Sequence, residues 1–536
     1  MKAAPVRESA ARTLVQPHVV PFDIDATRRM DNWRANLSWP LAMAPLQDAL
    51  TSRQRAFLES IGPLTEKDGR FIALLAAGRC LSSVSALLEA ALLVQAERTT
   101  GLHVVGGPAE LEWLRGVGEV PPMTAQRLGQ PGDRTIAMFA RRIARTASWT
   151  PWWRLPMTML QPDAVAITHN AMLREAAAEN GRRVAFRHGE VLFHAMTRRA
   201  TGTAGAPAGL AEMLTTTLCA EPALTETMRA RLAALVRPKL GRYLDQAAAD
   251  LAAIARAPRL PMRLWSGSGG NYAARALGIE VMRRGGETVR YDHGGSTGMI
   301  DGPDSLSLRE TTVSTRFVVP TEAVAQLCRA QDVARPVCGF PPAEISHGTG
   351  DPHMRGAARL APRPNGARPR VIYATGALYG FRQLIPPVLH DPVYLDWQLR
   401  VAEALGALPV DVLLKPHPEG IFRGQRHPLA YAGTVTSERF EAVMASADIF
   451  VFDFALSTAF WTALCSDRPV VLLDLGLAPF HPTIREELER RCRIVTAHWD
   501  IHNIPRVERE ELGQAISDAA RSRPDPTRFR QLIAGA

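Results

Sequence analysis

The chain of 536 residues is poor in lysine and cysteine. Lysine occurs at only four positions, although Lys and Arg together number 63; these are Lys2, Lys67, Lys239 and Lys415. The six cysteines are scattered and form no C-x-x-C pair, which argues against a structural zinc site and against a disulfide framework. We therefore expect the protein to work in a reducing, cytoplasmic environment.

The sequence also lacks an uninterrupted apolar run. The most apolar stretch, Phe71–Ala96, contains Arg79, Glu89 and several serines, which favours a buried helix over a membrane span. The first residues carry no apolar run, so we expect no signal peptide. No carboxylate cluster with metal spacing and no RNA-binding or zinc-finger signature is present. We expect no required metal or other cofactor, and no nucleic-acid partner.

What the sequence does contain is an excess of positive charge and ample apolar material. The formal net charge is +10, and 46% of the residues are hydrophobic. The apolar content is sufficient for two cores. The charge suits an anionic partner, such as a phosphorylated substrate or an acidic membrane face.

Short apolar runs alternate with helical stretches along most of the chain. This alternation predicts βαβ units and an α/β fold with parallel sheets. Two such series predict two doubly wound, Rossmann-like domains, with ligands beyond the carboxyl ends of the strands. The expected strands lie at 102–107, 163–170, 182–190, 262–270, 287–295, 371–376, 448–453 and 468–474, with further strands after residues 315, 410 and 491.

Composition suggests where the domains divide. Residues 341–370 are rich in Pro, Gly, Ala and Arg, which favours an interdomain connection just before or within them. We expect an N-terminal arm or helical cap over 1–60, an N-terminal domain over 61–335, a C-terminal domain over 336–525 and a tail over 526–536.

A histidine followed by small residues ends the expected strand 287–295. After His293 come Gly294 and Gly295, where the backbone can approach a substrate closely. The ordinary pKa of histidine suits proton transfer near neutral pH. A glycine-rich turn with a histidine that caps a strand is an equally good interpretation.

A second cluster, Lys415-Pro416-His417-Pro418-Glu419, follows an expected buried strand. Its two prolines hold Lys415 and His417 in a stiff, extended turn. A cation and an imidazole fixed together suit a phosphate oxygen, and Glu419 would contact the same ligand. The alternative is a rigid surface turn, but the rarity of lysine in this chain favours a functional role.

A third cluster lies where Asp453 ends a strand and Ser457 and Thr458 begin the next helix. A helix N-terminus offers free N–H groups and a positive dipole end, which suit a phosphate. The simpler interpretation is that Ser457 is only an N-cap.

Two weaker candidates complete the set. The turn after the strand at 262 contains Gly267 and Gly269, which would contact a ligand if it cradles a phosphate. It lacks the full G-x-G-x-x-G spacing, and a tight turn is the alternative. His188 ends another expected strand and is the reserve candidate for the catalytic base.

In order, these clusters resemble motifs of the CDP-glycerol:polyglycerophosphate transferases of teichoic acid synthesis, and of capsule polysaccharide transferases with the GT-B fold. The resemblance covers about residues 260–480, and residues 1–260 carry none of it. It rests on His293-Gly294 for H-G-T-P, Cys338–Pro341 for G-x-P-R, Val371–Ala374 for V-L-Y-A-P, Lys415–Pro418 for K-x-H-P, Asp448–Ser457 for D-x-x-x-x-D-x-S-S and Arg468-Pro469 for K-R-P.

The resemblance implies two GT-B-type domains that face a central cleft, an acceptor domain followed by a nucleotide-donor domain. It implies that His293 is the base on the acceptor hydroxyl, and that His417 and serine hydroxyls hold the donor phosphates. With Lys415 and Thr458, these groups would stabilise the leaving phosphate. The expected function is transfer of a glycosyl or polyol-phosphate group to a surface polysaccharide or lipid-linked acceptor.

The sequence departs from those motifs at two places. The T-P that follows His-Gly is replaced by Gly295-Ser296, and the segment Asp453–Ser457 lacks the tyrosine and has one residue more. A CMP-, CDP-, UDP- or GDP-linked donor therefore stays open. The alternatives are a sugar-nucleotide epimerase of the same architecture, or a non-catalytic nucleotide-sugar-binding component of a polymer assembly complex.

Basic and aromatic residues are interleaved between Arg134 and Arg154. The pattern favours an ordinary amphipathic helix followed by a Pro-Trp-Trp loop that packs in the core. The alternative is an interfacial surface, in which Trp152 and Trp153 contact the inner face of the cytoplasmic membrane.

Overall fold

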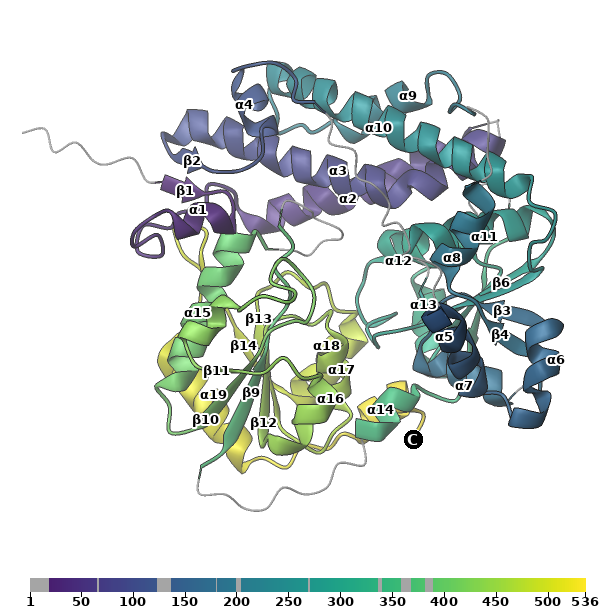
Figure 1. Ribbon diagram of the computed structural model, residues 1–536. Coiled ribbons are helices and arrows are strands. Elements are labelled where there is room, and N and C mark those ends of the chain that lie inside the picture. Colours follow the sequence, from purple (N-terminus) through teal and green to yellow (C-terminus); the bar gives the residue numbers. More distant parts are fainter. Residues whose placement is uncertain are drawn as a thin grey trace, which may run out of the picture.

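The computed structural model describes residues 19–64, 67–122, 136–179, 181–198, 204–268, 270–335, 340–357, 368–380 and 389–536. Two parallel sheets of six strands lie side by side, and a layer of long helices extends across both (Figure 1). The α/β class and the two parallel sheets expected from the sequence are confirmed, and the arrangement is compatible with two Rossmann-like domains.

The first sheet reverses its strand order between β3 and β5, and such a switch point is where open parallel sheets bind ligands. Its strands, from edge to edge, are β4 (Val184–Phe186), β3 (Ala164–Ala166), β5 (Arg263–Ser266), β6 (Glu287–Tyr291), β7 (Arg316–Val319) and β8 (Glu344–His347).

The second sheet has its switch point between β9 and β12. Its strands, in spatial order, are β11 (Thr434–Val435), β10 (Asp411–Lys415), β9 (Arg370–Ala374), β12 (Ile449–Phe452), β13 (Val470–Asp474) and β14 (Arg493–Thr496).

The strands of the second sheet are apolar on both faces because helices cover both. Val371 and Tyr373 of β9 lie in one apolar core, and Ile372 and Ala374 lie in another. Figure 1 shows helices on each side of this sheet. This arrangement explains the near-continuous apolar runs of its sequence. The helices are α15 (Asp391–Gly406), α16 (Phe440–Val443), α17 (Thr458–Leu464), α18 (Pro482–Arg491) and α19 (Arg509–Arg521).

Shorter helices surround the first sheet (Figure 1). They are α5 (Ile136–Ala147), α6 (Leu155–Leu160), α7 (Ala171–Glu179), α8 (Gly189–Thr197), α11 (Tyr272–Arg283), α12 (Pro303–Arg309) and α13 (Glu322–Ala330).

A helical layer formed by the N-terminal part of the chain spans the two sheets. In it, α10 packs along α3, and α2 and α9 pack beside them. Within the described residues α3 alone is long and apolar enough to cross a membrane, yet 78% of its most apolar window is buried inside the protein. Its apolar surface is therefore covered by the rest of the chain. These helices are α2 (Met43–Ile61), α3 (Lys67–Thr100), α4 (Glu110–Arg115), α9 (Leu210–Leu218) and α10 (Glu226–Ala255).

Several elements differ from the expected ones. The strand expected at 102–107 is β2 (His103–Val105), which pairs with β1 (Val19–Pro21) and belongs to neither large sheet. The first sheet includes β8, which follows the expected boundary between residues 335 and 336. The long helix α10 carried no expectation, because its apolar pattern is interrupted by charged residues and by Pro238.

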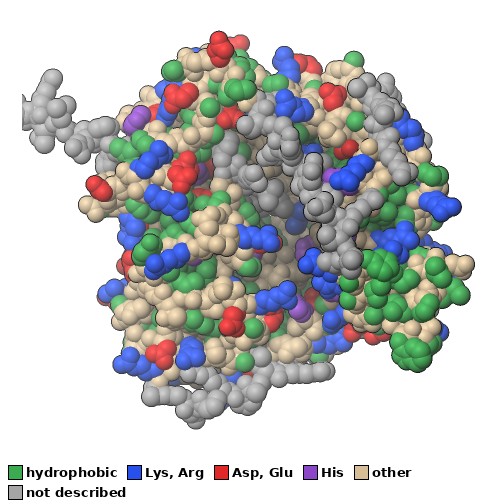
Figure 2. All heavy atoms as spheres, viewed as in Figure 1, with side chains coloured by type: hydrophobic (Ala, Val, Ile, Leu, Met, Phe, Trp, Pro, Cys, Tyr) green, Lys and Arg blue, Asp and Glu red, His purple; other side chains and the backbone are tan. Residues whose placement is uncertain are grey.

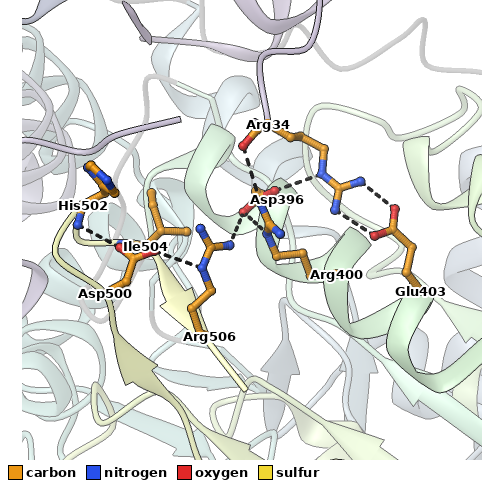
Figure 3. A network of polar contacts seen from close by, with 8 residues as sticks. All are labelled: Arg34, Asp396, Arg400, Glu403, Asp500, His502, Ile504 and Arg506. Atoms are coloured by element: carbon orange, nitrogen blue, oxygen red, sulfur yellow. Dashed lines mark hydrogen bonds and ion pairs between the residues drawn. The ribbon is translucent and has the colours of Figure 1, made fainter. Parts of the chain in front are cut away.

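The N-terminal segment is fastened to the second half of the molecule. The buried carboxylate of Asp396 accepts hydrogen bonds from Arg34 Nε at 2.9 Å, Arg400 Nε at 2.7 Å and Arg506 Nη1 at 3.3 Å (Figure 3). Arg34 also binds both oxygens of Glu403 through Nη1 and Nη2, at 2.5 and 2.9 Å. Three elements far apart in the sequence therefore share one carboxylate.

The two sheets share an apolar core. Phe317 of the first sheet, with Met299 and Met354 from segments that follow its strands, is buried in one cluster with Phe452 and Trp461 from the second sheet and its helices. Apolar packing between the halves holds the loops at the carboxyl ends of the strands in fixed positions.

Candidate functional site

The loop after β6 meets the loop after β12, so the carboxyl edges of the two sheets come together. A Cβ atom placed on Gly294 would lie 3.1 Å from Thr458 Oγ1. A Cβ atom placed on Gly295 would lie 2.5 Å from Met354 Cε and 3.0 Å from Trp461 Cβ. Both glycines have positive φ, 109° and 73°, which other residues rarely adopt. The His-Gly-Gly segment is therefore shaped to fit against α17.

His293 itself is exposed beside this contact. Its neighbour Asp292 is buried, and Thr297 Oγ1 donates to its carboxylate at 2.5 Å. Burial raises the pKa of the Asp292 carboxyl group. Asp292 therefore anchors the loop in the interior of the protein, while the imidazole of His293 is exposed to solvent. Figure 2 shows a hollow in the middle of this face of the molecule, with Lys, Arg and His side chains at its margin.

Asn170 organises the strand ends under this loop. Its Nδ2 donates to the carbonyl oxygens of Gly267, Tyr291 and Asp292, at 3.2, 3.1 and 2.8 Å. Its Oδ1 accepts from Leu173 N at 2.8 Å, which caps the start of α7. Asn170 was not among the residues expected at the site; the signal present in the sequence was a polar side chain between a strand end and a helix.

The expected ligand role of Gly267 has a structural alternative. Gly267 is buried, and a Cβ atom there would lie 2.6 Å from Asn170 Cγ, so close packing already requires glycine. Below the turn, the fully buried Arg290 donates to Ser266 Oγ at 2.6 Å and to the carbonyl of Ser268 at 3.1 Å. Gly269 lies outside the described residues.

Lys415 is the last residue of β10, and only 5% of it is exposed. Its Nζ donates to the carbonyl of Pro416 at 2.9 Å. Burial lowers the pKa of the ammonium group, and the carboxylate of Glu441 opposes that shift. A desolvated ammonium group with one acceptor at hydrogen-bond distance among the residues that the structure describes is suited to an anion at the strand end.

The ring of His417 is held in one orientation. Its Nδ1 accepts the backbone N–H of Glu419 at 3.2 Å, so the neutral ring carries its proton on Nε2. Burial, together with the positive charge of Lys415, lowers the pKa of His417. Gly420 has φ 104°, and a Cβ atom there would lie 2.5 Å from the carbonyl oxygen of Leu378. The turn is thereby locked onto the loop after β9, with Glu419 exposed.

Asp453 lies deep at the end of β12. It accepts hydrogen bonds from Tyr373 Oη at 2.6 Å, Tyr394 Oη at 2.9 Å and Trp397 Nε1 at 3.1 Å. Burial raises the pKa of its carboxyl group to about 6. Both carboxylate oxygens of Asp453 already accept hydrogen bonds from these three side chains. Asp453 therefore chiefly holds the aromatic side chains in place around the loop after β12.

Ser457 is the N-cap of α17, because its Oγ accepts from Ala459 N at 3.3 Å. The N-cap role expected for this serine is present in the structure. The helix has only 7 residues, so its dipole adds little. The position of Thr458 against Gly294 is the stronger reason to place this helix start at a site.

A narrow, largely apolar slot opens at the switch point of the second sheet. Its volume is about 40 Å³, and the loops after β9, β12 and β13 form its walls. Its lining includes Tyr379, Asp453, Phe454, Leu475 and Phe480. The two phenylalanines and the tyrosine suit the faces of a flat ring, such as a nucleobase, inserted edge-on.

A larger cavity of about 570 Å³ lies between the N-terminal segment and the second sheet. Carboxylates of Asp23, Asp25, Glu89 and Asp391 line it, and among the described residues of its lining only Arg28 carries a guanidinium group. This charge is unfavourable for phosphate groups. We therefore do not place a nucleotide donor there.

The strand order separates the two histidines considered as bases. His188 precedes α8 at the end of β4, whereas His293 follows β6, and β3 and β5 lie between these strands. Three strand spacings put the strand ends about 15 Å apart. The sequence did not signal His353 of α14 (Pro352–Ala357), which is exposed and directly precedes Met354, the residue at the contact with Gly295.

No protein-family model matches this chain, and no curated protein matches its sequence. Within the described residues, no group of three or more His, Cys, Asp or Glu side chains is arranged to hold a metal ion.

Proposed function

We propose that this protein is a transferase of GT-B architecture that moves a glycosyl or polyol-phosphate group from a nucleotide-activated donor to a glycan or lipid-linked acceptor. Its place would be the cytoplasmic face of the membrane, in surface polymer assembly. The contact between Gly294, beside His293, and Thr458 supports this proposal most directly. It brings together two clusters that the sequence singled out separately, each at the carboxyl end of a strand.

In the proposed reaction the acceptor hydroxyl attacks the transferred group. The bond from that group to the leaving phosphate oxygen breaks, and the hydroxyl proton passes to His293. The cation of Lys415, the Nε2–H of His417 and the hydroxyl of Thr458 stabilise the charge left on the phosphate. The ends of β10 and β12 are two strand spacings apart, about 10 Å, so a phosphate chain lying across the end of β9 would reach both.

Nucleotide binding tests the donor site. CMP, CDP, UDP and GDP and their sugar conjugates are titrated against the wild type by calorimetry. We expect one of these nucleotides to bind, and to bind His417→Ala at least about tenfold more weakly, because a charge-assisted hydrogen bond to phosphate is lost. If no nucleotide binds the wild type, the donor site is wrong.

His427→Ala is the matched control. Both rings accept, through Nδ1, the backbone N–H two residues further on, and both distances are 3.2 Å. Burial lowers the pKa of each ring. Loss of a turn-stabilising imidazole is therefore common to both variants, and only His417→Ala removes the proposed phosphate contact.

A second arm of the experiment separates binding from chemistry. With the nucleotide identified, His293→Ala should bind it as the wild type does and lose transfer by at least about 100-fold. His498→Ala, an exposed histidine of β15 (His498–Trp499), should keep both. Transfer retained in His293→Ala contradicts the assignment of the base. Nucleotide binding without transfer in the wild type favours the non-catalytic binding component instead.

A further inference from the structure

The edge of the first sheet carries a concentration of exposed apolar side chains. Eleven large apolar side chains are exposed in the part of the chain that the structure describes, and five of them lie between residues 139 and 160. Four of these form what we call the α6 patch: Trp152 at 81% exposure, Trp153 at 65%, Met157 at 50% and Leu160 at 78%. Figure 2 shows hydrophobic side chains gathered at the right of the molecule, over the region where Figure 1 places α6.

The patch is a continuous apolar face. The short 3₁₀-helix η1 (Trp152–Arg154) runs directly into α6, so the spacing of Trp153, Met157 and Leu160 places them on one side of a single helical run. The indole rings of Trp152 and Trp153 meet edge to face, with centroids 5.9 Å apart. By contrast Trp149 is 5% exposed, and its Nε1 donates to the carbonyl of Val184. The sequence favoured core packing for the Pro-Trp-Trp segment, and this interpretation is wrong, because Trp152 and Trp153 are exposed.

The charged residues of the segment that carries the patch have one sign. From Ile136 to Pro162 the sequence contains four arginines and no Asp or Glu, and these arginines are Arg141, Arg142, Arg145 and Arg154. Arg141 and Arg154 are exposed, and neither forms an ion pair with any residue that the structure describes. Thr146 Oγ1 accepts the N–H of Phe186 of β4, which ties α5 to the edge strand that leads to His188.

We propose that the α6 patch is a membrane-docking surface, in which Trp152, Trp153, Met157 and Leu160 enter the interface of an anionic bilayer and the surrounding arginines bind lipid phosphates. Tryptophan beside arginine is the combination that an interface favours, because one part of the surface is apolar and the other is charged. The four arginines of this segment match an anionic leaflet. This inference does not depend on the proposed enzymatic activity.

Vesicle flotation of the full chain tests the proposal. Vesicles of phosphatidylcholine alone are compared with vesicles containing about 30% phosphatidylglycerol, at low and high salt. We expect the wild type to float with the anionic vesicles at least about tenfold more than with the neutral ones, and less at high salt. Trp152→Ala/Trp153→Ala should lose this binding. Arg141→Gln/Arg154→Gln should lose the preference for anionic lipid.

The matched control is Tyr431→Ala/Ile501→Ala, which removes two equally exposed apolar side chains, at 80% and 93%, outside the patch. It should float as the wild type does. Circular dichroism and the melting temperature show whether each variant is folded. The proposal is overturned if the wild type fails to bind anionic vesicles, or if the folded tryptophan variant binds as well as the control. It is also overturned if the patch instead mediates self-association that the tryptophan variant abolishes.

Discussion

At the level of single residues, burial shifts the pKa values of two charged groups at the site. Asp453 and Lys415 both end strands of the second sheet, and both are buried, at 4% and 5% exposure. Burial disfavours the charged form of each, so it raises the pKa of the acid and lowers that of the base. Asp453 is compensated by three hydrogen-bond donors, whereas Lys415 has a backbone carbonyl oxygen. Asp453 thus has more hydrogen-bond partners than Lys415. This difference favours Lys415 as the group to which an anionic ligand would bind.

The raised pKa of Asp453 predicts a pH-dependent stability. Burial moves it from 3.8 to about 6 in the folded protein. Between these pH values the folded state holds a proton that the unfolded state has lost, so the stabilisation present at low pH is lost as the pH rises through about 6. The free energy of unfolding of the wild type should fall relative to that of Asp453→Asn between pH 4 and 7, by about 3 kcal/mol at most. Urea unfolding across this range measures the difference. A difference that stays constant with pH would contradict the prediction.

Among the elements, the C-terminal segment is more than the tail that the sequence suggested. The short helix α20 (Thr527–Phe529) and the π-helical turn η5 (Arg530–Ala534) pack against the loop that precedes α14. Asp351 N donates to the carbonyl of Ile533 at 2.8 Å, and Arg530 Nε donates to that of Cys465 at 2.8 Å. The last turn of the chain therefore contacts residues from both halves of the molecule.

This packing predicts that the C-terminal turn contributes to global stability. Ile533 is fully buried in the core that joins the two sheets, so Ile533→Ala should lower the free energy of unfolding by about 2–4 kcal/mol. Gln531→Ala, an exposed position in the same turn, should change it by less than about 0.5 kcal/mol. Denaturant unfolding compares the two variants. Equal effects would mean that this turn does not pack in solution as it does in the structure.

At the scale of the whole molecule, the two sheets are connected more extensively than two independent domains would need to be. One apolar core includes side chains from both sheets, and the N-terminal segment reaches α15 through Arg34 (Figure 3). Such connections favour a fixed cleft, and they restrict the domain closure that a two-domain transferase could otherwise use.

The Arg34 connection predicts a measurable stabilisation. Removal of this guanidinium leaves the fully buried Asp396 with two of its three arginines, so Arg34→Met should lower the free energy of unfolding by about 1–3 kcal/mol. The control is Arg28→Met, whose ion pair with Asp25 is exposed on both sides, at 57% and 79%. Exposed pairs contribute little, so this variant should lie within about 0.5 kcal/mol of the wild type. If both variants behave alike, the network in Figure 3 does not fasten the two halves.

The sequence by itself determined the parallel sheets and the position of most strand ends. Runs such as Ile449–Phe452 and Val470–Leu473 are apolar throughout, and only a strand covered on both faces buries such a run completely. The stiff turn after Lys415 was equally readable, because proline restricts the backbone locally. The positions of His293 and His417 directly after strands, and of Thr458 at the start of a helix, followed from the same pattern.

Only the tertiary structure decided which of these strand ends meet. The contact of Gly294 with Thr458 joins residues of two different sheets, and no local pattern encodes the packing of one sheet edge on another. The same holds for Asn170, whose three acceptors belong to two other strands. It also holds for Trp149 and Trp153, which have similar neighbours in sequence, although Trp149 is buried in the core and Trp153 is exposed on the surface. Strand formation depends on neighbours in sequence, whereas burial and contact depend on neighbours in space.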